Sequence, residues 1–205
     1  MSLRTRPRAW ALVPAVLAPV AMIGGWRLAA AQQPAFDPVA QTISALAAAP
    51  SSDTWIMTAG LALTGASHVV TALGLTGLPR PGRVLLALGG VATAAVAALP
   101  VDLHPAGHTV AATVGFVALA AWPAASARRE SGGPGPGVAG LPAPVAIGTT
   151  AALAALLGVF FLELTRVLPD DGAAVGLTER LVAGAQSLVP LGVVVGALVS
   201  GRPAR

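Results

Sequence analysis

Six apolar stretches dominate this sequence, and each has about the length that crosses a lipid bilayer. A helix needs about 20 apolar residues to span the hydrocarbon core. Only 10% of the 205 residues are charged, whereas a soluble domain carries about 25%. The sequence therefore predicts an all-α fold, a polytopic membrane bundle in one six-helix transmembrane domain over residues 1–205. The predicted spans cover residues 10–31, 55–78, 84–101, 108–127, 145–164 and 181–200, the third borrowing Pro100 and Val101 to reach the required length.

The connections between these stretches alternate in charge. Arginines stand in the N-terminal segment, the second and fourth connections and the tail, whereas aspartates stand in the first, third and fifth connections. Because cytoplasmic segments carry the excess of Lys and Arg, we expect a multi-pass cell-membrane protein with both termini in the cytoplasm. An alternative is a signal peptide cleaved near Ala31, which would leave five spans in the same orientation. A glycine- and proline-rich stretch, 131–137, is predicted to be a cytoplasmic linker.

Composition excludes several kinds of chemistry. The chain has no cysteine, so disulfides, thiolate catalysis and Cys-ligated zinc are excluded. All 12 basic residues are arginines, beside abundant alanine, glycine and proline, which suggests a GC-rich bacterial source. These arginines lie at the ends of spans and form no basic stripe, so nucleic acid is not an expected partner. No cofactor is expected, and membrane lipids are the expected partners.

Small residues in the spans predict close helix packing. Gly89-Gly90 in the third span, and Gly60 and Gly65 in the second, offer flat surfaces on which another backbone can approach. Gly192 and Gly196 form a GxxxG stripe in the sixth span. We favour packing within one bundle for this stripe, with a homodimer through Gly192 and Gly196 as the alternative.

The strongest polar cluster lies in the turn between the third and fourth spans, on the predicted outer side. Pro105 suits the first turn of a helix, which makes His104 the N-cap residue. Asp102 then lies just before the helix and His108 one turn inside it. We expect Asp102 and His108 to lie within hydrogen-bond reach, directly or through one water. The alternative role of these residues is helix capping alone.

Further polar residues are predicted at the same side or deeper. Glu179 and Arg180 begin the sixth span, and we expect them to complete one outer-face pocket with Asp102, His104 and His108. Helix N-termini and Arg180 would favour an anionic partner there, with the carboxylates balancing the charge, so the expected ligand is compact and polar, such as a lipid headgroup.

His68 lies about 20 Å below the start of the second span, at about 1.5 Å per residue. That depth does not match the depth of His104 and His108, so no metal site is predicted. His68 is instead expected to bond across helices to Ser67 or to a carbonyl group. Ser44, in the first outer loop, is a candidate nucleophile if His108 reaches it.

These motifs, in their order and spacing, resemble the DUF998 family of six-span bacterial and archaeal membrane proteins. The resemblance covers most of residues 36–198. It rests on Ile43-Ser44-Ala45-Leu46, which is expected to form a short helix on the outer face, the Gly60 to Gly65 stretch, Leu99-Pro100-Val101-Asp102 followed by His108, and Glu179-Arg180. The family is in turn distantly similar to the Frag1/DRAM/Sfk1 group, which is linked to lipid organisation and membrane trafficking. The resemblance implies a grouping of Ser44, Asp102, His108, Glu179 and Arg180.

Three functions follow from these observations. The first is binding of a lipid headgroup or small polar ligand at the outer face. The alternative is an intramembrane hydrolase that uses Ser44, Asp102 and His108, with or without a metal. A transporter ranks third, because transporters place their sites near the middle of the membrane and few polar residues are predicted there.

Overall fold

The computed structural model describes residues 7–128, 140–167 and 173–200. Its regular structure is helical throughout these residues, apart from one isolated bridge between Ala127 and Leu141. Six helices are long and apolar enough to cross a membrane, so the predicted all-α, six-span class is confirmed. The elements are η1 (Ala9–Ala11), α1 (Leu12–Ala31), η2 (Ser44–Ala47), α2 (Thr54–Gly74), α3 (Arg80–Ala98), α4 (Pro105–Ala125), α5 (Ala143–Leu164) and α6 (Val175–Ser200), of which η1 and η2 are short 3-10 turns.

The third span begins earlier than predicted. A proline stands in the first turn of α3, where its fixed φ suits a helix and its missing N–H leaves no intrahelical bond unmade. The helix ends at Ala98, so Pro100 and Val101 do not belong to the span. Its 19 residues reach about 28 Å at about 1.5 Å per residue, close to the thickness of the hydrocarbon core.

Two further helix starts carry polar residues, and the sequence predicted one of them correctly. α4 begins at Pro105 with His104 at its N-cap, as predicted. α6 begins at Val175, six residues before the predicted span, so Glu179 and Arg180 lie inside the helix and not ahead of it. Their side chains therefore project from a helix that is packed in the bundle.

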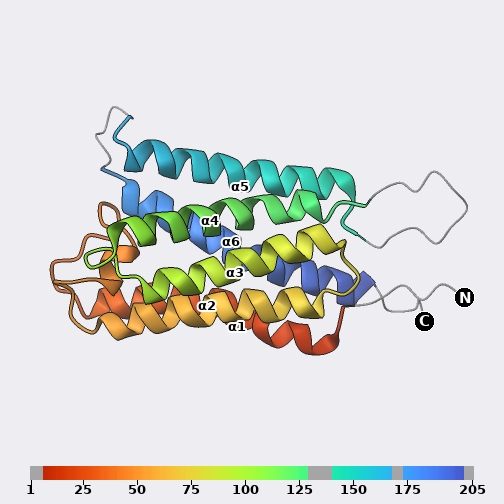
Figure 1. Cartoon of the computed structure of the whole chain (residues 1–205), viewed down its shortest axis with the longest axis horizontal. Coiled ribbons are helices and arrows are strands. Elements are labelled where there is room, and N and C mark those ends of the chain that lie inside the picture. The colour runs from red at the N-terminus through yellow and green to blue at the C-terminus, as the bar shows by residue number, and fades with distance from the viewer. Residues whose placement is uncertain (1–6, 129–139, 168–172, 201–205) are drawn as a thin grey trace, which may run out of the picture.

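The helices run back and forth in an antiparallel bundle (Figure 1). α1 to α4 each pack on the next helix along the chain, and α6 returns to pack on α1. α5 packs mainly on α4 and α6 and lies at the edge of the bundle (Figure 1). It is the least buried of the six, so α5 covers the seam between α4 and α6 and exposes most of its surface to lipid.

Glycines bring α2 against its two neighbours, as predicted. A Cβ atom at Gly65 would lie 2.5 Å from the Gly90 carbonyl oxygen, and a Cβ atom at Gly60 would lie 2.9 Å from the carbonyl oxygen of Ala21 on α1. Both contacts are shorter than real Cβ atoms allow, so only glycine permits these helix distances.

The GxxxG stripe of α6 behaves differently. Gly192 and Gly196 are exposed, and a Cβ atom at either would have no heavy atom within 4 Å. The preferred prediction, packing within one bundle, is wrong for this stripe. Its surface faces away from the other helices.

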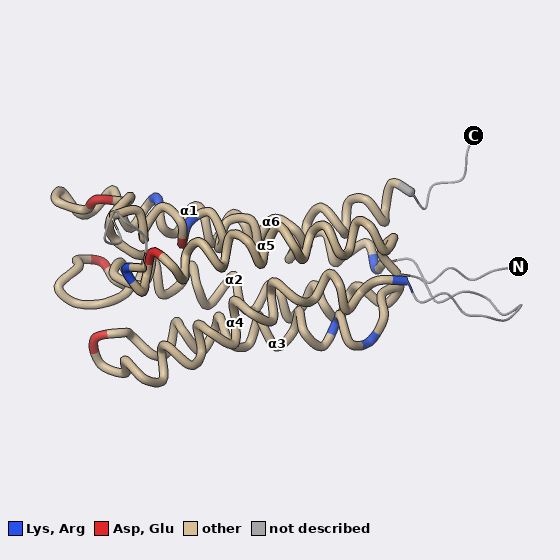
Figure 2. The backbone as a smooth tube through the Cα atoms, turned by 90° about the horizontal axis from the view of Figure 1, so that it is seen from above, with Lys and Arg blue, Asp and Glu red and all other residues tan. Residues whose placement is uncertain are grey.

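Charges separate to the two ends of the bundle (Figure 2). The connections α1–α2 and α3–α4 contribute aspartates to one end, here the acidic end, whereas the first turn of α3 and the segment after α4 contribute arginines to the other, the basic end. Arg27, Arg166 and Arg180 lie toward the acidic end. The linker 131–137, Asp170, Asp171 and the terminal arginines other than Arg8 lie outside the described residues. In the described part of the chain, acidic and basic segments therefore alternate between the two ends of the bundle.

The first loop, residues 32–53, folds into the acidic end of the bundle. Its η2 turn was predicted to lie on the outer face, but Ile43 and Leu46 are almost fully buried. They pack with Met22 of α1 and with Met57 and Leu61 of α2 in one apolar cluster. Burial of these apolar side chains draws η2 inward and carries the neighbouring Ser44 with it.

Candidate functional site

Ser44 meets His108 at the acidic end of the bundle. The Ser44 Oγ atom lies 3.0 Å from His108 Nε2, and His108 Nδ1 lies 2.8 Å from the carbonyl oxygen of Leu99. A carbonyl oxygen only accepts, so Nδ1 carries the hydrogen in this bond. In the neutral ring, Nε2 is then the acceptor for the Ser44 hydroxyl. This is the arrangement of a hydroxyl beside a positioned base.

Glu179 adds a carboxylate to this pair. The side chain is 5% exposed, and its Oε2 atom accepts the backbone N–H of Ile43. The Ser44 side chain also lies next to this carboxylate. A hydroxyl has one hydrogen, so Ser44 can donate to only one acceptor at a given moment. The three side chains thus form a chain of polar contacts from α4 through η2 to α6.

Arg180 binds to backbone carbonyl groups of the first loop. One guanidinium nitrogen, Nη1, donates to the carbonyl oxygens of Pro38 at 2.9 Å, Gln41 at 2.8 Å and Gly176 at 2.8 Å. The guanidinium also lies over the ring of Phe36, 5.4 Å from its centre. These contacts join the first loop to the start of α6, so the geometry makes Arg180 a positioning residue for the loop.

The predicted pairing of Asp102 with His108 is not formed directly. Asp102 is exposed, and its Oδ2 atom accepts the backbone N–H of Ala49 at 3.3 Å. Both ring nitrogens of His108 have other partners, Leu99 and Ser44. His104 is exposed, and its side chain makes no capping hydrogen bond to α4. Sequence spacing placed Asp102 and His108 at one end of a helix, but it did not show that the first loop would come between them.

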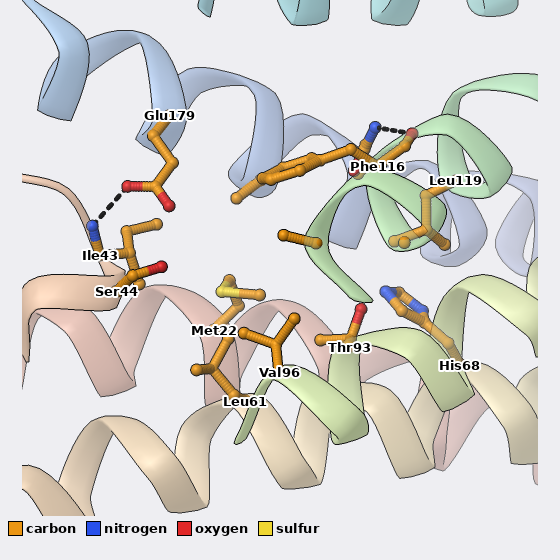
Figure 3. A pocket seen from close by; sticks show the side chains of 14 residues that line it. Met22, Ile43, Ser44, Leu61, His68, Thr93, Val96, Phe116, Leu119 and Glu179 are labelled. Atoms are coloured by element: carbon orange, nitrogen blue, oxygen red, sulfur yellow. Dashed lines mark hydrogen bonds between the residues drawn. The ribbon is translucent and has the colours of Figure 1, made fainter. Parts of the chain in front are cut away.

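A chamber lies next to Ser44 and Glu179 in the interior of the bundle (Figure 3). Its volume is about 50 Å³. Residues from α1, α2, α3, α4, α6 and the first loop line it. Most of the lining is apolar, from Met22, Ile43, Leu61, Val96, Ala112, Gly115, Phe116, Leu119 and Ala183, and its polar members are Ser44, His68, Thr93, Glu179 and Gln186.

The polar members gather toward two ends of the chamber. Glu179 and Ser44 lie toward the acidic end, and His68 and Thr93 lie deeper (Figure 3). Gln186 is seven residues beyond Glu179 on α6, about 10 Å along the helix axis. Apolar side chains, including Met22 and Leu61, separate the two ends. The chamber thus holds polar groups at both ends and an apolar wall between them.

His68 has no protein partner at Nδ1. The residue is 1% exposed, and its Nδ1 atom is buried without a hydrogen bond in the structure. The predicted bond to Ser67 or a neighbouring carbonyl is therefore absent at this atom. His68 lines the chamber (Figure 3). An unpaired buried nitrogen is costly, and it points to a further hydrogen-bonding group in this space.

Sequence reasoning missed Gln186 and Thr93. Both side chains are buried, and each donates a hydrogen bond to a backbone carbonyl oxygen. Gln186 Nε2 donates to Phe116 at 2.9 Å, and Thr93 Oγ1 donates to Gly89 at 2.8 Å. The signal in the sequence was the amide itself, since a glutamine inside an apolar span is uncommon and faces protein. Of the predicted ligand-binding residues, only Glu179 lines the chamber, joined there by the candidate nucleophile Ser44.

No metal centre is visible in the described part of the chain. Within residues 7–128, 140–167 and 173–200, no three His, Asp or Glu side chains are grouped so that they could hold an ion. His68 lies deep in the bundle, whereas His104 lies at its acidic end. The expectation of no metal site stays a prediction.

Comparison with protein families gives one result. The model of the family described as "Protein of unknown function (DUF998)" matches residues 16–196. Comparisons with curated proteins and with solved structures gave no match. The wider similarity to the Frag1/DRAM/Sfk1 group stays a prediction. Because the matched region covers most of the chain, including every long helix in whole or in large part, this multi-pass membrane protein belongs to the DUF998 family.

Proposed function

We propose that this protein binds a small polar ligand, or the polar headgroup of a lipid, in the chamber beneath its first loop. The observation that carries the proposal is a cavity lined by the Glu179 carboxylate and by the buried His68, whose Nδ1 atom has no hydrogen-bond partner in the described structure. A polar group left unbonded in an apolar interior costs about 1–3 kcal/mol. A bound ligand or water that donates and accepts there would remove this cost.

The position of the chamber supports a ligand from the membrane. Phe116 separates it from α5, and the Phe116 and Phe160 rings lie 5.5 Å apart at the seam that α5 covers. One hydrogen bond, from Gln186 to the Phe116 carbonyl, joins α6 to α4 beside this wall. A modest outward movement of α5 would give a lipid access between α4 and α6.

Identification of the bound molecule tests the proposal. The full chain is purified in mild detergent and examined by native mass spectrometry with lipid extraction. Ala183→Leu should remove the bound species because the larger side chain fills the chamber. Gly115→Ala should reduce the amount bound because Gly115 lines the chamber, and its added methyl group meets only ordinary contacts near Thr93, which the fold tolerates.

The control is Ala154→Leu on the exposed face of α5, which adds the same atoms outside the chamber. Equal occupancy in Ala183→Leu, Gly115→Ala and the control would contradict binding in the chamber. No bound species in the wild-type protein, from several membrane sources, would do the same.

A second function, hydrolysis, has one favourable observation, the contact of Ser44 with His108. A backbone carbonyl holds the imidazole, in place of the predicted Asp102. Against it, the amides on both sides of Ser44 already have partners, Glu179 and Thr42, so neither is free to stabilise an oxyanion. Binding is therefore the better supported function.

Covalent labelling separates the two functions. Membranes are treated with a fluorophosphonate probe, and the Ser44 peptide is analysed by mass spectrometry. For a binding protein we expect no adduct at Ser44. A Ser44 adduct that disappears in His108→Ala would favour the hydrolase, and Asp102→Asn should leave that labelling unchanged.

We propose further that both termini lie in the cytoplasm and that the acidic end faces outward. Basic connections at one end of the bundle support this orientation. The exposed Gly192 and Gly196 stripe supports a homodimer through α6, since small residues let two backbones approach in lipid. Crosslinking in membranes tests the dimer: Gly192→Leu should reduce the dimer fraction, and an unchanged fraction would contradict it.

A further inference from the structure

The charge and hydrogen-bonding capacity of the chamber limit which ligand it can take. We infer that the chamber receives a primary ammonium group, from a free small amine or from an aminophospholipid headgroup. The inference rests on the proposed binding function and names the ligand class for that site. It follows from the acceptors, the charge, the aromatic wall and the size of the chamber.

The acceptors outnumber the donors. Thr93 donates its hydroxyl hydrogen to the Gly89 carbonyl oxygen, so toward a ligand its oxygen can only accept. Gln186 has Nε2 bonded to Phe116, and its amide oxygen has no donor in the structure. The Glu179 carboxylate only accepts, and it has about four lone-pair sites, of which few are used. A ligand that satisfies these groups must donate several hydrogen bonds.

The charge of the chamber points the same way. Of the described residues that line it, only Glu179 bears a charged group. Arg180 is adjacent in sequence, but its Nη1 atom is occupied by three carbonyl groups and the residue does not line the chamber. The expected preference for an anion therefore has no basic group to support it. A cation would instead meet a carboxylate in a region of low dielectric constant, where the attraction is strong.

The apolar wall also suits an ammonium group. Phe116 lines the chamber (Figure 3), and aromatic rings attract ammonium ions through their negative faces. His68 supplies a ring nitrogen with no protein partner. An ammonium group has three N–H donors, and at the acidic end of the chamber it would meet the Glu179 carboxylate and the Ser44 oxygen, whereas His68, Thr93 and Gln186 lie toward the deeper end.

The size sets the part of the ligand that enters. One water-sized position takes about 10–15 Å³ of cavity volume, so the 50 Å³ of the chamber provides about three to five positions. An aminoethyl group has about three non-hydrogen atoms and fits. A complete lipid does not, so any longer portion must extend out of the chamber toward the membrane.

The test uses the full-length protein in nanodiscs of phosphatidylcholine, which has no primary amine. Thermal unfolding is followed with ethylammonium, ethanol or acetate at equal ionic strength, and separately in nanodiscs that contain phosphatidylethanolamine. We expect ethylammonium or phosphatidylethanolamine to raise the midpoint of unfolding, and ethanol and acetate to leave it unchanged. A response to ethylammonium in phosphatidylcholine identifies a free amine as sufficient, and a response only to phosphatidylethanolamine identifies the lipid.

Two variants show whether the response comes from the chamber. Glu179→Gln keeps an oxygen that can accept from Ile43 but removes the charge, and we expect the apparent affinity for the amine to fall about tenfold or more. The control is Asp53→Asn, an exposed carboxylate at the same end, at a left-handed position that Asn tolerates. It should retain the wild-type response.

The outcomes separate the two proposals. Stabilisation by acetate or ethanol that Gly115→Ala abolishes would overturn the ammonium inference and keep the binding function. An amine response that Glu179→Gln leaves unchanged would also overturn it. If none of the probes binds and Gly115→Ala behaves as wild type throughout, both the inference and the binding function fail.

Discussion

Arg180 is held in a membrane span by backbone carbonyl groups at Nη1 and by the ring of Phe36, while its buried Nη2 atom has no hydrogen-bond partner in the described structure. Its Nη1 atom serves three carbonyl oxygens, and its guanidinium lies over Phe36. In the sequence, Arg180 beside Glu179 suggested a ligand-facing charge. The two side chains diverge instead: Glu179 points to η2 and the chamber, whereas Arg180 joins the first loop to the start of α6.

Loss of Arg180 should therefore lower stability whether or not ligand is present. Arg180→Ala leaves three carbonyl groups without this donor, and we expect the free energy of unfolding to fall by about 1–3 kcal/mol. Arg27→Ala, an exposed arginine of α1 near the same end, should change it by less than about 0.5 kcal/mol. Unfolding in SDS titrations measures both. A loss of stability that appears only when ligand is added would instead support a role for Arg180 in binding.

At the scale of the helices, apolar periodicity and proline placement predicted much of the fold. All six spans, the N-cap at His104 and the glycine contacts of α2 follow from local patterns that physical chemistry constrains strongly. The start of α3 was misplaced because Arg80 and Arg83 stand in its first turn, and the start of α6 because the charged pair Glu179-Arg180 follows its first turn, and helix ends are the least certain part of such an assignment. The burial of η2 was missed because it depends on tertiary packing of the first loop against α1 and α2, and on the bond of Ile43 to Glu179 of α6, which local sequence patterns do not show.

Glycine substitutions test the packing of these helices. Gly65→Ala should lower the free energy of unfolding by about 1–3 kcal/mol, because its Cβ would meet the Gly90 carbonyl at 2.5 Å. Gly196→Ala has open space around it and should be neutral, or stabilising by up to about 1 kcal/mol through helix propensity. Thermal unfolding of both variants in one detergent gives the comparison. Equal losses would mean that α2 and α3 are farther apart than described.

At the scale of the whole molecule, the bundle has one end fastened by polar contacts and a sparsely packed helix on one side. The first loop is held by Asp102 of the α3–α4 connection, by His108 of α4, and by Glu179 and Arg180 of α6. The sequence grouped these residues correctly at one end, but their shared role in holding the loop needed the three-dimensional structure. α5 contacts mainly α4 and α6, so the route that we propose for the ligand passes the least buried helix of the bundle.

Orientation in the membrane is open to a direct test, because the chain has no cysteine and any introduced thiol is unique. Leu103→Cys lies at the acidic end and is 70% exposed in the wild type. Arg128→Cys lies at the basic end. We expect an impermeant maleimide to label Leu103→Cys on intact cells and Arg128→Cys only after permeabilisation. The reverse pattern would place the basic end outside.

The central claim is that the chamber holds a ligand between Glu179 and His68. The most direct measurement is a crystal structure of the protein grown from lipid, at a resolution that shows bound small molecules. We predict non-protein density in the chamber, with an atom about 2.7–3.2 Å from His68 Nδ1 or from a Glu179 carboxylate oxygen. A chamber closed by protein side chains, with His68 Nδ1 bonded to a protein group, would contradict the claim.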